Sequence, residues 1–138
     1  MECKNEAIGK YISEIYRNSC RFFSKEFLKL NLGVGQYIFL IQLYKRDGIN
    51  QEELSELLKI DKANTARAIK RLEEEGYVIR IRCKEDKRAY NVFLTDKALD
   101  IKEEFFGILQ SWENNITQPL TEEEIIIVKK ILKKITVN

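Results

Sequence analysis

Two neighbouring segments of the chain concentrate side chains that can bind phosphates and hydrogen-bond to bases. Residues 62–72 contain four basic residues and no acid, and residues 80–88 contain five basic residues against two acids. Lysine and arginine neutralise phosphates, and arginine and asparagine also make bidentate hydrogen bonds to guanine and adenine. The chemistry that these segments predict is recognition of duplex nucleic acid. The candidate contact residues are Lys62, Asn64, Thr65, Arg67, Lys70, Arg71, Lys84, Asp86, Lys87 and Arg88.

The type of each side chain suggests its role. Asn64 can hydrogen-bond to adenine and Arg67 to guanine. Lys70 and Arg71 are expected to contact phosphates. Arg88 stands at the tip of a charged segment, where it can enter a narrow, electronegative minor groove, and Asp86 can pair with its guanidinium. Three alternatives stay open: a solvated helical face, a helix-capping role for the asparagine and threonine, and a surface ion pair of little energetic value.

Residue types that are missing narrow the functional class. The 138 residues include 24 basic and 22 acidic side chains but no histidine, so the usual general base and the commonest metal ligand are both absent. No nucleophile stands beside a plausible base, and no glycine-rich phosphate loop is present. We therefore expect no enzymatic activity, no catalytic residue, no metal site and no cofactor. The net charge of +2 leaves local clustering as the only electrostatic signal.

The cysteines and the apolar segments indicate a cellular compartment. Cys3, Cys20 and Cys83 are odd in number and widely spaced, which fits neither a zinc site nor a disulfide framework. The start lacks an apolar signal segment, and the longest apolar run, 37–41, is too short to cross a membrane. We expect a cytoplasmic protein with no membrane partner. A buried structural role is expected for Cys20, and redox activity of Cys20 or Cys83 stays open.

Apolar periodicity predicts a mainly α-helical chain with one pair of strands. Helices are expected over 8–30, 36–46, 51–58, 62–75, 96–116 and 121–135, and strands over 78–83 and 89–94. Asn50 with Glu53, and Thr121 with Glu124, have the spacing of capping boxes, and Asp61 is an expected cap. The expected buried stripes are Leu54, Leu57 and Leu58 in the third helix and Ala66, Ile69 and Leu72 in the fourth.

The order of these elements defines the expected fold class. Only three residues separate the third and fourth helices, a spacing that resembles a helix-turn-helix without the glycine often found in its turn. The charged segment 84–88 joins the two strands as a wing. The fold class is therefore mainly α with a two-stranded β wing, a winged helix-turn-helix core flanked by N- and C-terminal dimerisation helices.

The segment from Asp61 to Ala98 resembles the core signature of the MarR (multiple-antibiotic-resistance regulator) family. The matching residues are Arg71-Leu72-Glu73, Gly76-Tyr77-Val78, Arg80, Asp86-Lys87-Arg88-Ala89, Val92 and Leu94-Thr95-Asp96-Lys97. The chain departs from the family pattern at Ala98, where glycine is usual, and at Cys83, in a stretch usually rich in proline and acid. The resemblance implies a dimeric transcriptional regulator of bacteria and archaea, with helix 62–75 in the major groove and Arg88 in the minor groove.

The chain divides into three expected parts: an N-terminal dimerisation helix (1–34), a winged helix-turn-helix DNA-binding core (35–95) and C-terminal dimerisation helices (96–138). The apolar stripes at the two ends exceed what the middle can cover, which predicts a two-fold homodimer. The resemblance further implies a small aromatic effector in a cleft between the DNA-binding lobe and the dimerisation helices. Its candidate lining residues are Tyr11, Tyr16, Phe22, Tyr37 and Tyr44, each of which has core packing as an alternative role.

The predicted function is a sequence-specific regulator of transcription that binds double-stranded DNA, a ligand-responsive repressor acting as a homodimer on a pseudo-palindromic operator. Its half-sites are expected about one helical turn, roughly 34 Å, apart. The alternative is a protein-interaction module that uses the winged helix as a scaffold without specific DNA binding. A monomer at micromolar concentration with no affinity for DNA would favour that alternative.

Overall fold

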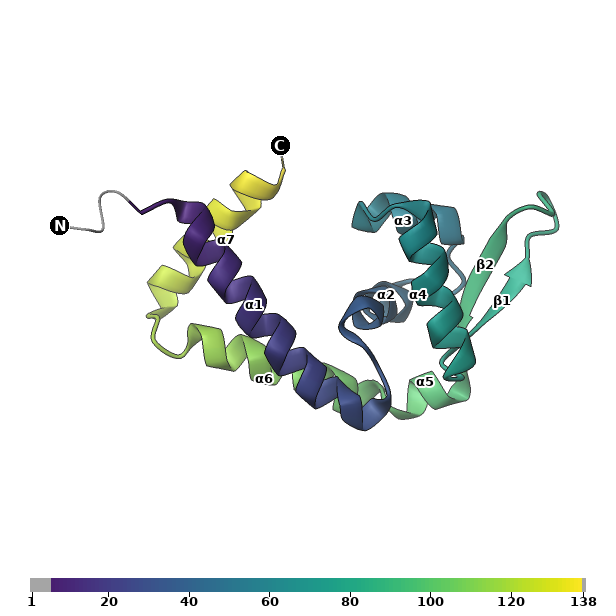
Figure 1. The fold of residues 1–138 in the computed structure, drawn as a ribbon, viewed down its shortest axis with the longest axis horizontal. Coiled ribbons are helices and arrows are strands. Elements are labelled where there is room, and N and C mark those ends of the chain that lie inside the picture. The colour runs from purple at the N-terminus through teal and green to yellow at the C-terminus, as the bar shows by residue number, and fades with distance from the viewer. Residues whose placement is uncertain (1–5, 138) are drawn as a thin grey trace.

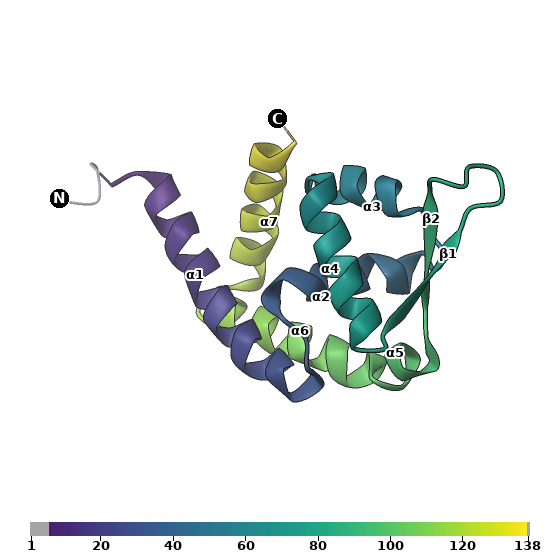
Figure 2. The same cartoon turned by 45° about the vertical axis from the view of Figure 1, so that its right-hand side comes forward.

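The computed structural model describes residues 6–137, so Cys3 lies outside the described residues. The elements are α1 (Ile8–Phe27), the 3-10 helix η2 (Leu28–Leu30), α2 (Val34–Lys45), α3 (Gln51–Leu58), α4 (Lys62–Glu74), β1 (Val78–Arg82), β2 (Tyr90–Leu94), α5 (Asp96–Asp100), α6 (Lys102–Thr117) and α7 (Glu122–Thr136). Helices α2 to α5 and the antiparallel hairpin form a lobe, and α1, α6 and α7 form an arm on one side of it (Figures 1 and 2). The hairpin projects from the far side of the lobe. The expected fold class, a winged helix with flanking helices, is confirmed.

The helices of the lobe begin where their capping residues predict. The side chains of Asn50 and Asp61 accept hydrogen bonds from backbone N–H groups in the first turns of α3 and α4, and the capping box at Thr121 is present. The predicted box at Asn50 is incomplete. The carboxylate of Glu53 lies 2.6 Å from Nη1 of Arg46 instead, because an arginine brought alongside by the fold offers a charged partner.

The turn between α3 and α4 is built without glycine. Lys59 adopts the left-handed conformation (φ 54°) in its place, and its N–H donates to the last carbonyls of α3. Glycine is required instead at Gly48 (φ 81°), where a Cβ atom would lie 2.8 Å from the ring of Phe93. Gly76 (φ 82°) follows α4 as predicted. These positions turn the chain sharply enough to pack α3, α4 and the hairpin together.

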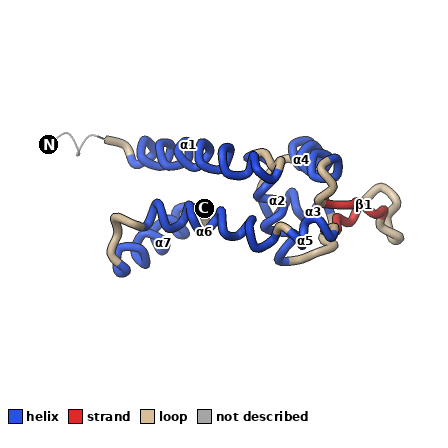
Figure 3. Tube along the Cα trace, turned by 90° about the horizontal axis from the view of Figure 1, so that it is seen from below, coloured by secondary structure: helices blue, strands red, loops and turns tan. Residues whose placement is uncertain are grey.

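The single long helix expected over 96–116 is wrong, because the chain bends at Ile101 (φ −90°, ψ −1°) between α5 and α6. The bend lets α5 stay with the hairpin while α6 runs alongside α1 (Figure 3). Phe105 is then fully buried, with ring centroids 5.2 Å from Phe27 and 5.3 Å from Tyr44. Burial of this phenylalanine at the junction of lobe and arm accounts for the bend.

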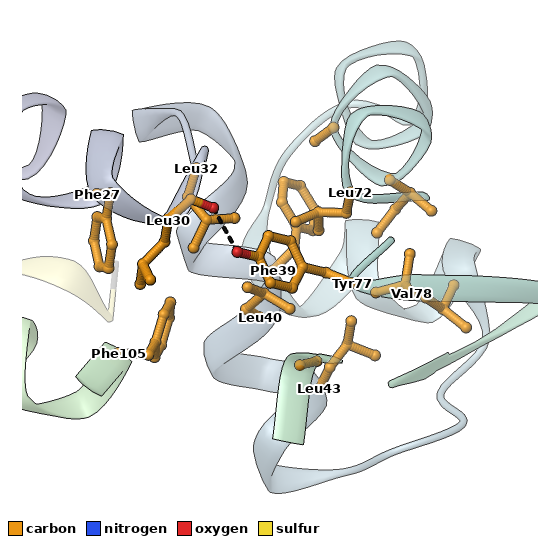
Figure 4. Close-up of a cluster of buried hydrophobic side chains, with 14 of the residues drawn as sticks. Phe27, Leu30, Leu32, Phe39, Leu40, Leu43, Leu72, Tyr77, Val78 and Phe105 are labelled. Atoms are coloured by element: carbon orange, nitrogen blue, oxygen red, sulfur yellow. Dashed lines mark hydrogen bonds between the residues drawn. The ribbon is translucent and has the colours of Figure 1, made fainter. Parts of the chain in front are cut away.

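One continuous apolar core joins the lobe to the arm. Figure 4 shows Phe27, Leu30 and Phe105 together on one side of this core and Leu72 and Val78 on the other, with the hydroxyl of Tyr77 pointing toward Leu30. The Tyr77 hydroxyl donates a hydrogen bond to the carbonyl of Leu30 at 2.5 Å, which satisfies two buried polar groups at once. The expected boundary between residues 34 and 35 falls inside α2, which begins at Val34.

Three of the expected buried positions are not fully buried. Leu57 is 55% exposed, Leu58 is half-buried, and Ala66 is half-buried because Thr65 occupies the interior position. The observed stripe of α4 is Thr65, Ala68, Ile69 and Leu72. Counted from Thr65, the other three residues lie three, four and seven positions further on, which follows the 3.6-residue repeat of a helix. The predicted stripe, with a residue at every third position, follows that repeat less closely.

The arm leaves a large apolar surface uncovered. No residue of α7 is buried, and Ile127, Ile131 and Ile135, which lie on one side of the helix, are exposed. The first half of α1 is equally open, with Ile8 70% and Ile15 52% exposed. Such contiguous apolar surface is typical of a protein interface.

Candidate nucleic-acid interface

Helix α4 carries most of the predicted contact residues, and the hairpin lies next to it (Figure 2). Lys62, Asn64, Arg67, Lys70 and Arg71 are all exposed. At about 100° per residue, Arg67 and Lys70 point most directly away from the buried stripe, whereas Asn64 and Arg71 lie on the side toward α2. The helix therefore offers two cations outward and further polar groups at its edges.

Thr65 does not belong to this surface. Its side chain is fully buried, and its hydroxyl oxygen has no hydrogen-bond partner within the described residues. The expectation that Thr65 contacts nucleic acid is therefore wrong. The physical reason is that Thr65 lies three residues before Ala68 and four before Ile69, on the side of α4 that packs into the core.

The wing and the start of α4 border a common hollow. It is lined by Lys62 from α4, by Asp86 and Arg88 from the hairpin and by residues of α3, so the fold brings together residues that are 26 positions apart in sequence. The remaining wing lysines, Lys84 and Lys87, are exposed on the loop between the strands. A second hollow, between α2 and α4, is lined in part by Asn64, Arg67 and Arg71.

Asp86 contacts both the backbone and the side chain of Arg88, the arginine of the wing. The backbone N–H of Arg88 donates to Oδ1 of Asp86 at 3.0 Å, and the same oxygen lies 3.5 Å from Nε of Arg88. The predicted ion pair is thus present, while the side chain of Arg88 remains 94% exposed. Cys83 leaves the hairpin regular, because its N–H donates to the carbonyl of Ala89 at 2.9 Å.

Glu52 is a component of the surface that sequence reasoning missed. Its carboxylate lies 2.5 Å from Nζ of Lys62, and this hydrogen bond raises the pKa of Lys62. The first lysine of α4 is therefore engaged with an acid of α3 and meets a phosphate only in competition with that acid. The ten-residue separation between Glu52 and Lys62 gives no signal in sequence, because it arises from the turn at Lys59.

The start of α4 also carries a connected set of polar side chains. Both carboxylate oxygens of Asp61 accept hydrogen bonds from Asn64, one from its backbone N–H at 2.7 Å and one from Nδ2 at 2.6 Å. Arg67 donates in turn to Oδ1 of Asn64. The backbone N–H of Asn64 is the main cause of the lowered pKa of Asp61, and the amide of Asn64 and the charge of Arg67 lower it further.

The five aromatic residues expected to line an effector cleft fall into separate environments. Tyr11 and Tyr16 are exposed on α1. Phe22 and Tyr37 both contact Phe23, whereas Tyr44 contacts Phe105 and donates its hydroxyl hydrogen to the carbonyl of Ala98 at 2.5 Å. Burial raises the pKa of Tyr44 to about 12. Neither of the two hollows described above is lined by any of the five.

Other kinds of site are not seen in the part of the chain that the structure describes. Over residues 6–137 there is no group of three histidine, cysteine or acidic side chains placed to hold a metal ion. No helix in that range is both long enough and apolar enough to span a bilayer. Cys20 and Cys83 are both free and half-buried. The exposed polar surface of α4 and the wing is thus the principal candidate site.

Known proteins resemble this chain in both architecture and sequence. The model of the MarR family matches residues 32–90. A regulator of the same family from Methanosarcina mazei is 40% identical, with a TM-score of 0.89 over 95% of this chain and 94% of that one. A MarR-family structure from Listeria monocytogenes, solved with a 26mer DNA, is 32% identical with a TM-score of 0.88 over 96% and 89% of the two chains.

A relative from Clostridioides difficile, the HTH-type transcriptional regulator BilQ, is 29% identical over 99% of this chain and 93% of its own length. Fold, hairpin and sequence therefore define a winged-helix protein of the transcription-regulator class, not an enzyme. The chain belongs to the MarR family.

Proposed function

We propose that the protein is a sequence-specific DNA-binding regulator of transcription that acts as a homodimer on a pseudo-palindromic operator and represses by excluding polymerase. The observation that carries this proposal is the shared surface of Lys62, Asp86 and Arg88, next to the outward cations of α4. A helix of this kind enters the major groove, and an arginine on the adjacent hairpin reaches the minor groove. Operator DNA lies in the prokaryotic cytoplasm, so the proposal places the protein there.

The exposed arginine of the wing provides the most specific test. Arg88→Ala should weaken binding to the operator by about 1 to 3 kcal/mol, chiefly through the base pairs that flank the half-sites. The measurement is fluorescence anisotropy with labelled duplexes at fixed salt. Lys87→Ala is the matched control, because it removes a neighbouring exposed cation without removing the side chain oriented by Asp86. Equal affinity of wild type and Arg88→Ala would refute the role of Arg88.

Phosphate contacts are distinguished from base contacts by their salt dependence. Lys70→Ala and Arg71→Ala should weaken specific and random duplexes by similar factors, because phosphates are the same in every sequence. Each substitution should also reduce the slope of log K against log salt by about one. An unchanged slope would exclude phosphate contact by the residue that was replaced.

The uncovered surface of α1 and α7 supports the homodimer. Two copies related by a two-fold axis would bury the same apolar residues on both sides, for which Ile131 and Ile15, each about half exposed, are available. A dimer also presents two α4 helices, which is what a pseudo-palindromic operator requires. Sedimentation velocity at micromolar concentration tests this part of the proposal, and a stable monomer would contradict it.

A small aromatic effector is the third part of the proposal. Aromatic side chains where the arm meets the lobe support it, because Phe23 of α1 lies 4.8 Å from Tyr37 of α2 and 5.9 Å from Trp112 of α6, measured between ring centroids. Trp112 is the single tryptophan of the chain, so its fluorescence reports on this region without substitution. A panel of hydroxybenzoates should include at least one compound that changes Trp112 fluorescence saturably and lowers operator affinity. A panel without effect on either quantity would remove the effector from the proposal.

A further inference from the structure

Three side chains at the start of α4 form a hydrogen-bonded relay. Oδ2 of Asp61 accepts from Nδ2 of Asn64 at 2.6 Å, and Oδ1 of Asn64 accepts from Nη2 of Arg67. We propose that Asn64, anchored by Asp61, is a positioning residue that fixes the direction of the Arg67 guanidinium, so that Arg67 reads a base and Asn64 does not. This inference rests on the proposed function in DNA recognition.

The chemistry of the three groups determines which way the amide points. An ionised carboxylate can only accept hydrogen bonds, and a guanidinium can only donate them. The residue between them must therefore present a donor to Asp61 and an acceptor to Arg67, which an amide does. The orientation of Asn64 follows from its neighbours. An aspartate or an apolar side chain of the same size would lack one or both of these bonds.

The geometry of α4 separates the two roles. Arg67 lies close to the opposite side of the helix from the buried Ile69 and Leu72, whereas Asn64 lies about 60° around the helix from Arg67. The arginine is thus the residue directed outward. Its guanidinium has five N–H donors, so one bond to Asn64 leaves four for a guanine edge.

The relay contributes through orientation more than through stability. All three side chains are exposed, and exposed polar pairs of this kind add little to the free energy of folding. A free arginine, however, loses rotamer freedom when it binds a base. Holding Arg67 in one direction before binding removes part of that entropic loss. The effect should therefore be seen in base discrimination and hardly at all in thermal stability.

Variants of the relay can be chosen so that α4 remains folded. Asn64→Leu has nearly the same shape but neither hydrogen bond. Asp61→Ser keeps a hydroxyl that can cap the helix but lacks the second oxygen that accepts from Asn64. Both variants should melt near the wild-type temperature. Both should also reduce the preference for guanine at one base pair of each half-site by about tenfold, and Arg67→Ala should abolish that preference.

The double variant decides between positioning and direct reading. If Asn64 acts through Arg67, Asn64→Leu should add no loss of discrimination in the Arg67→Ala background, because the arginine that it orients is gone. The measurement is anisotropy with a panel of duplexes, each carrying one base-pair change in the operator that wild type selects. A loss of preference at a second base pair that persists without Arg67 would show that Asn64 reads DNA itself and would overturn the inference.

The controls separate failure of the relay from failure of the proposed function. Wild-type protein that discriminates no base pair would refute sequence-specific binding itself. If Asn64→Leu and Asp61→Ser discriminate the base pair read by Arg67 as well as the wild type does, DNA recognition is intact and only the relay is refuted. Asn64→Asp provides a further check, because it keeps the acceptor for Arg67 but places a carboxylate against Asp61. Partial recovery of discrimination relative to Asn64→Leu is expected.

Discussion

The apolar side of α7 offers a quantitative test of the homodimer through Ile131→Glu. The side chain of Ile131 is 51% exposed in the single chain. Complete burial of an isoleucine contributes about 1.5 to 3 kcal/mol, so covering the remaining half contributes about 1 kcal/mol per copy. A symmetric dimer contains the residue twice, so loss of the apolar contribution alone amounts to about 2 kcal/mol, or about 30-fold in the dimer dissociation constant. Burial of an unpaired carboxylate adds to this cost.

The matched control is Ile126→Glu on the same helix. Ile126 is 67% exposed and lies among the lysines, about 140° around α7 from Ile131. Sedimentation equilibrium over a range of concentrations gives both dissociation constants, and circular dichroism checks that the helices are retained. We expect Ile131→Glu to dissociate the dimer and Ile126→Glu to leave it nearly unchanged. Dimerisation of Ile131→Glu as tight as wild type would refute the assignment of this side of α7 to the interface.

Two other predictions concern contacts within one chain. Tyr77→Phe leaves the buried carbonyl of Leu30 without its donor and should lower the free energy of unfolding by about 1 to 2 kcal/mol in urea titrations. The control is Tyr90→Phe, which should change this free energy little because the Tyr90 hydroxyl has only a 3.4 Å contact with Arg82. Equal effects of the two substitutions would contradict the prediction. Glu52→Gln frees Lys62 and removes a negative charge from the DNA-binding surface, so it should strengthen binding to any duplex and steepen the salt slope by up to about one. Weaker binding would show that Glu52 supports the surface instead of competing for it.

Features of the fold that depend on neighbouring residues are predictable from sequence, whereas those that depend on distant residues are not. The caps at Asn50 and Asp61 involve side chains and N–H groups two or three residues apart, and they are confirmed. The partner of Glu53 is Arg46, seven residues away and just beyond the end of α2, so spacing alone assigns Glu53 wrongly to a capping box. The bend at Ile101 escaped prediction for the same reason, because the packing of Phe105 between lobe and arm determines it.

The candidate site shows the same division. The Asp86–Arg88 pair spans two residues, and its geometry follows from the loop alone. Thr65 was misplaced because the apolar positions of α4 fit two helical registers, and only packing against the core selects the one that buries it. Glu52 was missed because the turn at Lys59 brings it to Lys62. Tertiary packing thus decides which polar residues of a recognisable motif remain available to a partner.

The most direct test of the central claim is selection of bound duplexes from a random DNA pool by the wild-type protein at fixed salt, with Arg88→Ala in parallel. Sequence-specific recognition by a homodimer predicts enrichment of a two-fold symmetric motif, with half-site centres about one helical turn apart and with flanking positions that Arg88→Ala no longer enriches. Failure of a folded, dimeric protein to enrich any motif, with and without the hydroxybenzoate panel, would contradict the claim and favour a protein-interaction module.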